Sequence, residues 1–205
     1  MSIEFSIKAS PGTDVWRKPP TTDVFNAPRH SHPSNTKSTS PLSTFHSARV
    51  SFLLPPTSTL TQYDQAGLLL SLTPSSSSAA AASTTAAASS PPKWIKTGVE
   101  IYNGVPRAAT VACDSWADWS LATVAGEAGA WVTVEVVSGK DELGKSLWVY
   151  QVVGEDRIPL REVCWLYGLE GDAWEVTVEA YACRPNKETG EELTAQFKDF
   201  EIRWT

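Results

Sequence analysis

The sequence has few of the residues that crosslink a chain or bind nucleic acid. Its three cysteines, Cys113, Cys164 and Cys183, are an odd number, lie far apart and form no CxxC motif or Cys/His cluster. This argues against a disulfide framework and against a structural zinc site. The 17 Lys and Arg residues are outnumbered by 23 Asp and Glu residues, which gives a net charge of -6. An acidic chain is a poor partner for a phosphate backbone, so we expect no nucleic-acid binding.

Long apolar runs are also missing. The longest ones fall well short of the roughly 18 residues that cross a bilayer, so we expect no membrane association. The first residues, MSIEFSIKAS, have no basic start followed by an apolar run, and no signal peptide is expected. Together with the cysteine pattern, these absences predict a cytoplasmic protein.

The sequence does have enough apolar material for one core. Hydrophobic residues make up 41% of the 205 residues, and this length suits a single domain over 1–205. The nine tryptophans favour β-structure, where they occupy cores and binding faces.

Two segments of this domain are predicted to be loops. Residues 74–92 contain a run of only Ser, Ala and Thr between prolines, which offers nothing large to bury and predicts a flexible loop. Residues 19–44 are rich in Pro, Ser and Thr and include His30 and His32. These histidines could share a strand face as metal ligands, but solvated loop histidines are far more common. We therefore expect no metal and no other cofactor.

Most of the remaining chain alternates with a period of two, as half-buried strands do. Residues 94–102 are the clearest case, with Ile, Thr and Val on one face and a polar-aromatic set on the other: Trp94, Lys96, Gly98, Glu100 and Tyr102. Asn103-Gly104 is the favoured pair for a two-residue hairpin, so a partner strand is expected over 106–113. Other strands are expected at 4–8, 47–54, 66–72, 132–136, 147–153, 160–167, 174–181 and 198–204. Helical spacing is absent, which predicts an all-β antiparallel sandwich or barrel.

Six blocks resemble those of a known family and occur in the same order. They are TDVWRKP (13–19), QYDQAGLLL (62–70), WIKTGVEIYNGVP (94–106), SWADWS (115–120), YACRP (181–185) and FKDF (197–200). The chain resembles the family named after the fungal regulation-of-enolase protein, a domain of uncertain biochemical function that is also found in bacteria. The Pro-rich loop after Trp16 and the Ser/Ala insertion depart from the family pattern.

The resemblance implies a concanavalin A-like antiparallel jelly-roll sandwich, in a superfamily whose members bind or cleave glycans on the concave face. The family name implies a cytosolic role around glycolysis, but no agreed chemistry. Because a fold does not fix a function, the site has to be argued from individual residues.

The polar face of residues 94–102 is the main candidate for a binding site. A sugar needs flat apolar contact for its C–H face, which Trp94 or Tyr102 could provide, and fixed donors and acceptors for its hydroxyls, which Lys96 and Glu100 could provide. Gly98 would let a ligand or another backbone approach closely. The alternative is an exposed sheet face with a cross-strand ion pair worth under about 1 kcal/mol.

Further ligand-binding candidates come from the other blocks. They are Asp64 and Gln65 in QYDQAGLLL, Asp118 and Trp119 in SWADWS, and Arg161, which matches a family arginine. Each has a structural alternative, since Asp64 could cap a turn, Trp119 could be core and Arg161 could form a structural salt bridge.

Catalysis has less support in the sequence than binding. A glycosidase needs two carboxyl groups about 5 to 10 Å apart, and no run of alternating acids supplies them. The nearest pair, Glu175 and Glu179, lies about 13 Å apart along one strand. There is no G-x-S-x-G motif for nucleophilic catalysis. If the protein is an enzyme, Glu100 is the expected acid or base.

The sequence therefore leads to three functional hypotheses. The first is a non-catalytic cytosolic module that binds a carbohydrate or sugar-derived metabolite and is linked to the regulation of sugar metabolism. The second is a glycoside hydrolase or related carbohydrate-active enzyme. The third is a protein-interaction scaffold whose partner is a metabolic enzyme such as enolase.

Overall fold

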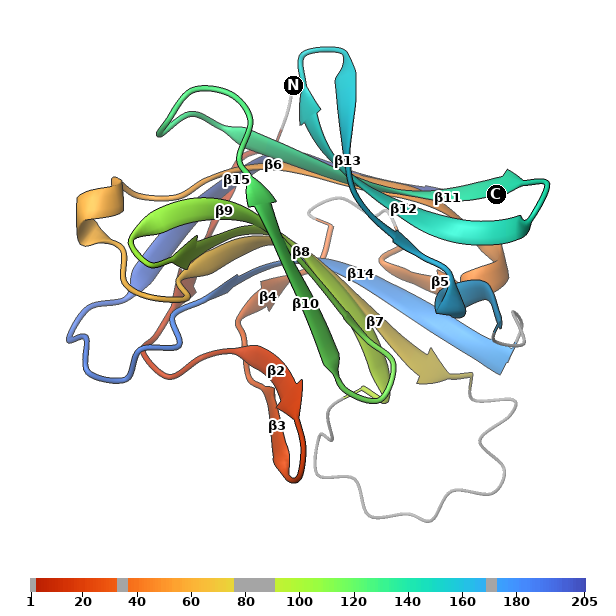
Figure 1. Cartoon of the computed structure of the whole chain (residues 1–205), viewed down its shortest axis with the longest axis horizontal. Coiled ribbons are helices and arrows are strands. Elements are labelled where there is room, and N and C mark those ends of the chain that lie inside the picture. Colours follow the sequence, from red (N-terminus) through yellow and green to blue (C-terminus); the bar gives the residue numbers. More distant parts are fainter. Residues whose placement is uncertain (1–2, 33–36, 76–90, 169–172) are drawn as a thin grey trace.

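The protein is a sandwich of two antiparallel sheets in the computed structural model, which describes residues 3–32, 37–75, 91–168 and 173–205 (Figure 1). In the described residues, one sheet has six strands in the order β1 (Phe5–Ala9), β15 (Leu193–Trp204), β6 (Phe45–Leu53), β11 (Val132–Asp141), β12 (Gly144–Val153) and β13 (Asp156–Val163). The other has the order β10 (Ala117–Thr123), β9 (Val105–Cys113), β8 (Lys93–Tyr102), β7 (Gln65–Pro74), β14 (Trp174–Cys183) and β4 (Arg29–His30), with β5 (Thr39–Pro41) also paired to β14. The expected jelly-roll sandwich is confirmed.

The core lies between the two sheets and follows the alternation of the strands. On β8, Ile95 and Val99 face the other sheet and pack with Phe52 and Val134 from that side. Alternate residues point the opposite way, so Trp94 belongs to a separate, smaller cluster on the outer face of the seven-stranded sheet. The seven-stranded sheet is therefore packed on both of its faces. Side chains on its outer face can support a site on that side.

The hairpin between β8 and β9 forms as the sequence predicts. Tyr102 pairs with Val105, and the two residues between them, Asn103 and Gly104, have φ values of 51° and 74°. Two positive φ values are the signature of the type I′ turn, which Asn-Gly favours because both residues tolerate this conformation.

The N-terminal part of the chain covers the outer face of the seven-stranded sheet. A separate hairpin of β2 (Val15–Lys18) and β3 (Thr22–Phe25) stands on this side (Figure 1). Val15 and Ala27 are buried against Leu69 and Trp94, and Trp16 and Phe25 pack around them. We call residues 14–27 the N-terminal cover. It is the roof of the site described below.

The predicted loops differ in outcome. Residues 19–44 contain the short strands β3, β4 and β5 and a 3-10 turn, η1 (Leu42–Thr44). Their many prolines and polar residues hide this, because each strand is too short to show a period of two. Residues 76–90 of the predicted 74–92 loop lie outside the described residues.

The strand predicted at 160–167 begins earlier and ends earlier, as β13, and is followed by a 3-10 turn, η3 (Trp165–Gly168). Pro159 lies within β13, beside a register shift between Val149 and Tyr150 of β12. Proline is tolerated there because β13 is an edge strand.

Another 3-10 turn, η2 (Thr57–Thr59), precedes β7. No helix in the described part of the chain has the length and apolar character needed to cross a membrane.

Gly67 of β7 and Gly98 of β8 are directly opposite each other. A Cβ atom on Gly98 would lie 2.0 Å from the carbonyl oxygen of Ala66, and one on Gly67 would lie 2.0 Å from that of Thr97. Of the two roles expected for Gly98, the structure therefore shows the close approach of another backbone.

Candidate functional site

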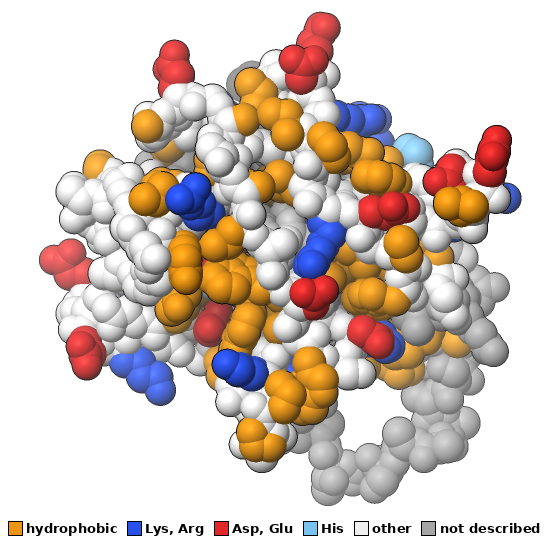
Figure 2. Space-filling view, viewed as in Figure 1, with side chains coloured by type: hydrophobic (Ala, Val, Ile, Leu, Met, Phe, Trp, Pro, Cys, Tyr) orange, Lys and Arg blue, Asp and Glu red, His pale blue; other side chains and the backbone are white. Residues whose placement is uncertain are grey.

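A pocket of about 410 Å³ lies on the outer face of the seven-stranded sheet, beneath the N-terminal cover. Figure 2 shows hydrophobic side chains exposed above the β2–β3 hairpin, with charged groups of both signs beside them. Eight residues line the pocket: Asp14, Trp16, Lys18, Tyr63, Gln65, Lys96, Glu100 and Trp119. We call it the outer-face pocket.

The floor of the pocket is organised around the amide of Gln65. Its Oε1 accepts hydrogen bonds from Lys96 Nζ at 2.7 Å and from the Tyr181 hydroxyl at 3.2 Å. Its Nε2 donates to Asp14 Oδ1 at 3.3 Å and to the Tyr63 carbonyl oxygen at 3.2 Å. The amide thus joins β7, β8, β14 and the N-terminal cover, and its acceptor and both donors are satisfied.

Lys96 is a buried cation with a partial counterion. Its side chain is only 3% exposed, and Nζ lies 3.6 Å from Asp14 Oδ1. Nζ also lies 5.9 Å from the centroid of the Trp16 ring, within the range of a cation–π contact. A buried ammonium group needs this kind of compensation, because its desolvation is costly.

Glu100 is the most perturbed acid of the pocket. Burial raises the pKa of its carboxyl from 4.5 to about 7, because the charged form is desolvated. The charge of Lys96 lowers this pKa, the charge of Asp14 raises it, and the Trp119 indole lowers it again. The indole N–H of Trp119 is buried and faces the carboxyl group without the geometry of a full hydrogen bond. Near neutral pH, Glu100 therefore exchanges between a hydrogen-bond donor and an anion.

Aromatic rings form the wall of the pocket. Trp119 on β10 makes edge contacts with Trp16, Tyr63 and Tyr102, at centroid distances of 6.3, 6.4 and 5.4 Å. Tyr63 is 41% exposed and Trp16 is partly exposed, so ring surface is available to a ligand. Such edge-to-face contacts fix the ring orientations.

Tyr63 is held in a backbone conformation that tyrosine rarely adopts. Its φ is 68°, in the left-handed region. Its N–H donates to the Ile101 carbonyl oxygen at 2.8 Å, and its own carbonyl oxygen accepts the Gln65 amide. Strain of this kind, retained by hydrogen bonds on both sides of the residue, is common at functional sites. The side chain of Tyr63 lines the pocket.

The structure brings together four of the nine predicted binding residues. Gln65, Lys96, Glu100 and Trp119 line the outer-face pocket. Tyr102 contacts Trp119 at the edge of the aromatic wall but does not line the pocket itself.

Trp94 lies on the predicted face of β8 but is fully buried in the small outer cluster, where Leu69, Val111 and Tyr181 also pack. Trp94 therefore supports the sheet beneath the pocket and offers no ring surface to a ligand.

Three predicted residues lie outside the pocket in ion pairs. Asp64 is fully buried and bound by Arg184, with Nη2–Oδ2 at 2.8 Å and Nε–Oδ1 at 3.2 Å. It also accepts the Thr61 N–H at 2.8 Å, which is the turn-capping role considered from the sequence. Asp118 is exposed and pairs with Arg161 at 3.1 Å, which links β10 to β13.

Sequence reasoning missed Asp14, Trp16, Lys18 and Tyr63 as lining residues. All four stand within blocks that carried the family resemblance, TDVWRKP and QYDQAGLLL. Their position within these blocks was the signal that could have identified them. Period-two patterning could not supply it, because Asp14 and Tyr63 lie outside the strands.

The described residues include no group of three or more His, Cys, Asp and Glu side chains placed to hold a metal ion. His30 stacks on Phe5 at 4.5 Å, and a ring nitrogen of His32 lies 2.6 Å from the Phe200 carbonyl oxygen. The two histidines are thus engaged with different partners.

The chemistry of the pocket combines three features that a sugar-sized polar ligand requires. Ring surface accepts C–H groups, buried polar groups with fixed orientation recognise hydroxyls, and partial enclosure excludes water. Asp14 and Glu100 are also close enough for the charge of one to raise the pKa of the other. A pair of carboxyl groups is what glycoside hydrolysis generally uses.

Known proteins are similar to this chain in sequence and in fold. An uncharacterized protein of Emericella nidulans is 38% identical over 207 residues, covering 100% of this chain and 88% of that protein. A functionally unknown protein of Saccharomyces cerevisiae has a similar structure, with a TM-score of 0.67, 16% identity and coverage of 98% of this chain and 88% of the other.

The crystal structure of a variant of alginate lyase A1-II′ is similar at a TM-score of 0.55 and 13% identity, over 100% of this chain and 80% of the lyase. At these identities the structural likeness shows the fold alone, which is the concanavalin A-like lectin/glucanase jelly roll. The family model described as a protein of unknown function, DUF1349, matches residues 2–204. The chain belongs to the DUF1349 family.

Proposed function

We propose that the protein is a non-catalytic cytoplasmic module that binds a carbohydrate or sugar-derived metabolite in the outer-face pocket. One observation carries the proposal. Aromatic rings from three segments of the chain, Trp16, Tyr63 and Trp119, meet over a floor of buried polar side chains in a pocket of about 410 Å³. This volume falls in the usual range for small-ligand sites, about 300 to 1,000 Å³.

The aromatic rings and the polar side chains of the pocket would bind different parts of a sugar. The rings of Tyr63 and Trp119 would contact the C–H face of a sugar, which loses little on leaving water. The carboxyl groups of Asp14 and Glu100 would bind its hydroxyls, with Lys18 at the rim. Because Gln65 already fixes Lys96 and Asp14, the polar groups need little reorganisation on binding.

The fold supports a sugar as the ligand class. The lectin/glucanase jelly roll is shared with a structure named as an alginate lyase, so this architecture accommodates carbohydrate chemistry. Fold alone does not carry function, and the argument for this chain rests on the pocket.

A thermal-shift screen against monosaccharides, oligosaccharides and glycolytic intermediates tests the proposal. A ligand at 100 times its dissociation constant stabilises the native state by about 2.7 kcal/mol, which raises the melting temperature by several degrees. Trp119→Ala should abolish the shift. Trp148→Ala is the matched control, because Trp148 lies on the six-stranded sheet and stacks on Tyr150. A flat screen would refute the proposal.

Catalysis is the second candidate, and the coupling of Asp14 with Glu100 favours it. A carboxyl group with a pKa near 7 can act as a general acid at neutral pH. Any sugar that binds should then be incubated with the protein and analysed for products. Turnover that Glu100→Gln removes, with binding retained, would replace the non-catalytic proposal with this one.

A link to enolase regulation is a further part of the proposal and rests on the family resemblance. The protein would act on sugar metabolism through its ligand or through contact with a metabolic enzyme. Co-purification with and without the sugar identified in the screen separates these routes. If the screen finds no sugar and co-purification still captures a partner, the scaffold function is favoured.

A further inference from the structure

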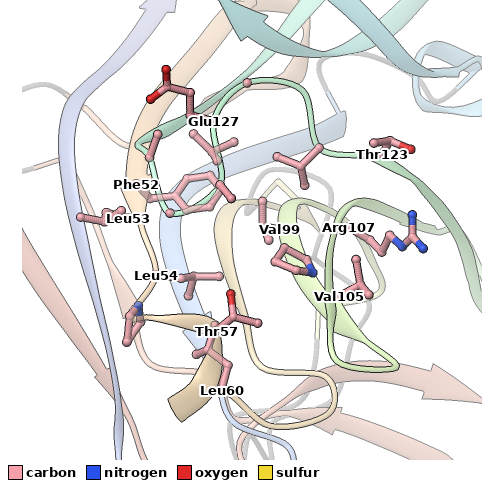
Figure 3. A pocket seen from close by; sticks show the side chains of 18 residues that line it. Phe52, Leu53, Leu54, Thr57, Leu60, Val99, Val105, Arg107, Thr123 and Glu127 are labelled. Atoms are coloured by element: carbon pink, nitrogen blue, oxygen red, sulfur yellow. The ribbon is translucent and has the colours of Figure 1, made fainter.

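A second cavity, of about 240 Å³, opens at one end of the sandwich between the two sheets (Figure 3). Its inner surface includes Phe52 of β6 and Val99 of β8, which are 1% and 3% exposed and belong to the main core. Leu54, Leu60 and Val124 pack around the opening. We call it the end cavity. Among the described residues, it has no lining residue in common with the outer-face pocket.

The end cavity is bounded by a loop that is held in place from outside. Residues 124–131 join β10 to β11, and small residues dominate the part that lines the cavity: Gly126, Ala128, Gly129 and Ala130. The side chain of Gln151, which is buried on β12, donates to the Ala125 carbonyl oxygen at 2.7 Å and accepts the Ala125 N–H at 2.9 Å. The loop is therefore anchored by polar contacts, and its small side chains leave space beneath it.

The opening carries two features that the fold itself does not require. Val105, at the tip of the β8–β9 hairpin, is 44% exposed beside the cavity. Arg107, two residues further along β9, has no side-chain hydrogen bond or ion pair with any residue in the described part of the chain. Figure 3 shows Arg107 at the rim on the β9 side and Glu127 on the opposite side, with its carboxylate turned away from the cavity.

We infer that the end cavity binds a medium-length aliphatic carboxylate, with its chain between the sheets and its carboxylate at Arg107. Apolar walls select a chain, because burying each methylene group is favourable. The cavity exceeds the roughly 150 Å³ that holds a benzene ring, so it has room for a chain of about eight carbons. Arg107 is the one cation among the described lining residues, which selects an anionic head group. This inference is independent of the sugar site.

Isothermal titration of the full chain with octanoate, 1-octanol and octylamine tests chain and head group separately. We expect octanoate to bind, 1-octanol to bind about fivefold more weakly and octylamine to bind more weakly still, since a rim charge contributes modestly. Arg107→Gln should weaken octanoate about fivefold and leave 1-octanol unchanged. Arg203→Gln is the matched control, because Arg203 is an exposed arginine on β15 whose side chain is 68% exposed.

Val105→Trp places a large ring at the opening and should weaken both octanoate and 1-octanol at least tenfold. Circular dichroism checks that Val105→Trp folds. If it does not fold, Arg107→Gln, which changes a surface residue, still tests the inference. The inference is overturned if neither octanoate nor 1-octanol binds, or if Val105→Trp folds and binds both as the wild type does. Equal affinity for all three head groups, unaffected by Arg107→Gln, would overturn the assignment of the carboxylate.

Discussion

Asp14 Oδ1 lies 3.6 Å from Lys96 Nζ, and this contact joins the N-terminal cover to the central strand of the outer-face pocket. The same Asp14 oxygen accepts the Gln65 amide and the N–H of its own neighbour Val15. The roof and the floor of the pocket are thus connected through one carboxylate. The charge state of Glu100 depends on both members of the pair.

Removing Asp14 and removing Lys96 should shift the pKa of Glu100 in opposite directions. Asp14→Asn deletes a negative charge that raises this pKa, so the value should fall below about 7. Lys96→Met deletes the positive charge that lowers it, so the value should rise. Carbon-detected NMR titration of the Glu100 carboxyl measures both. Unchanged values in both variants would mean that burial alone sets the pKa.

Glu100 should also make folding stability depend on pH. The unfolded carboxyl ionises near 4.5 and the native one near 7, so between these values the native state holds a proton that the unfolded state has lost. Stability therefore falls as the pH rises through this window, and the full cost applies above it. At about 1.4 kcal/mol per pH unit the cost is about 3 kcal/mol.

Glu100→Gln lacks this ionisation and provides the comparison. Urea unfolding at pH 4 and pH 8 should show the variant gaining on the wild type by about 3 kcal/mol between the two conditions. Parallel stability curves for the two proteins would show that the carboxyl group of Glu100 does not titrate differently on folding.

The two ion pairs that lie outside the pocket should differ sharply in their contribution to stability. Asp64→Ala leaves the buried Arg184, 5% exposed in its side chain, without its carboxylate, and should cost about 3 to 5 kcal/mol. Asp118→Ala breaks an exposed pair in which the Asp118 side chain is 77% exposed, and should cost under about 1 kcal/mol. Equal costs in chemical denaturation would contradict the structural role assigned to Asp64.

Gly98→Ala should destabilise the protein by about 3 kcal/mol or more, because its Cβ would meet the backbone of β7 and neither strand can move away within the sheet. Gly190→Ala is the control, since a Cβ there has nothing within 4 Å. Thermal unfolding of both variants measures the difference. A tolerated Gly98→Ala would show that β7 and β8 separate more easily than their register implies.

The sequence predicted most strands of the sandwich, but not β4, β5 and β10, and it predicted one half of the site. Alternation over 94–102 places Lys96 and Glu100 on one face, as β8 has them, because alternate side chains of a strand share a face; the half-buried strand that the pattern indicates is in fact buried on both faces. It does not reveal what covers that face. Trp94 shares the face with Lys96, yet it is buried under the N-terminal cover, while Tyr102 lies at the edge of the aromatic wall.

Neighbouring residues in the family blocks show the same limit. Gln65 begins β7 and points to the pocket, whereas Asp64, one residue earlier, binds Arg184. Trp119 lines the pocket and Asp118, its neighbour on β10, turns to Arg161. Consecutive residues of a strand such as β10 point in opposite directions, and Asp64 lies just before β7 begins, so a block that belongs to a site contributes only some of its side chains. The cover itself was missed because its two strands are only four residues long and are joined through Pro19 and Pro20.

The indole N–H signals of the protein in an NMR titration test the central claim most directly. They are assigned with single Trp→Phe variants and followed during addition of the sugar that gives the largest thermal shift. We predict that the signals of Trp16 and Trp119 move together with saturation, while that of Trp148, on the other sheet, stays in place. If no sugar of the panel moves Trp16 and Trp119, or if Trp148 moves instead, the outer-face pocket is not a sugar-binding site.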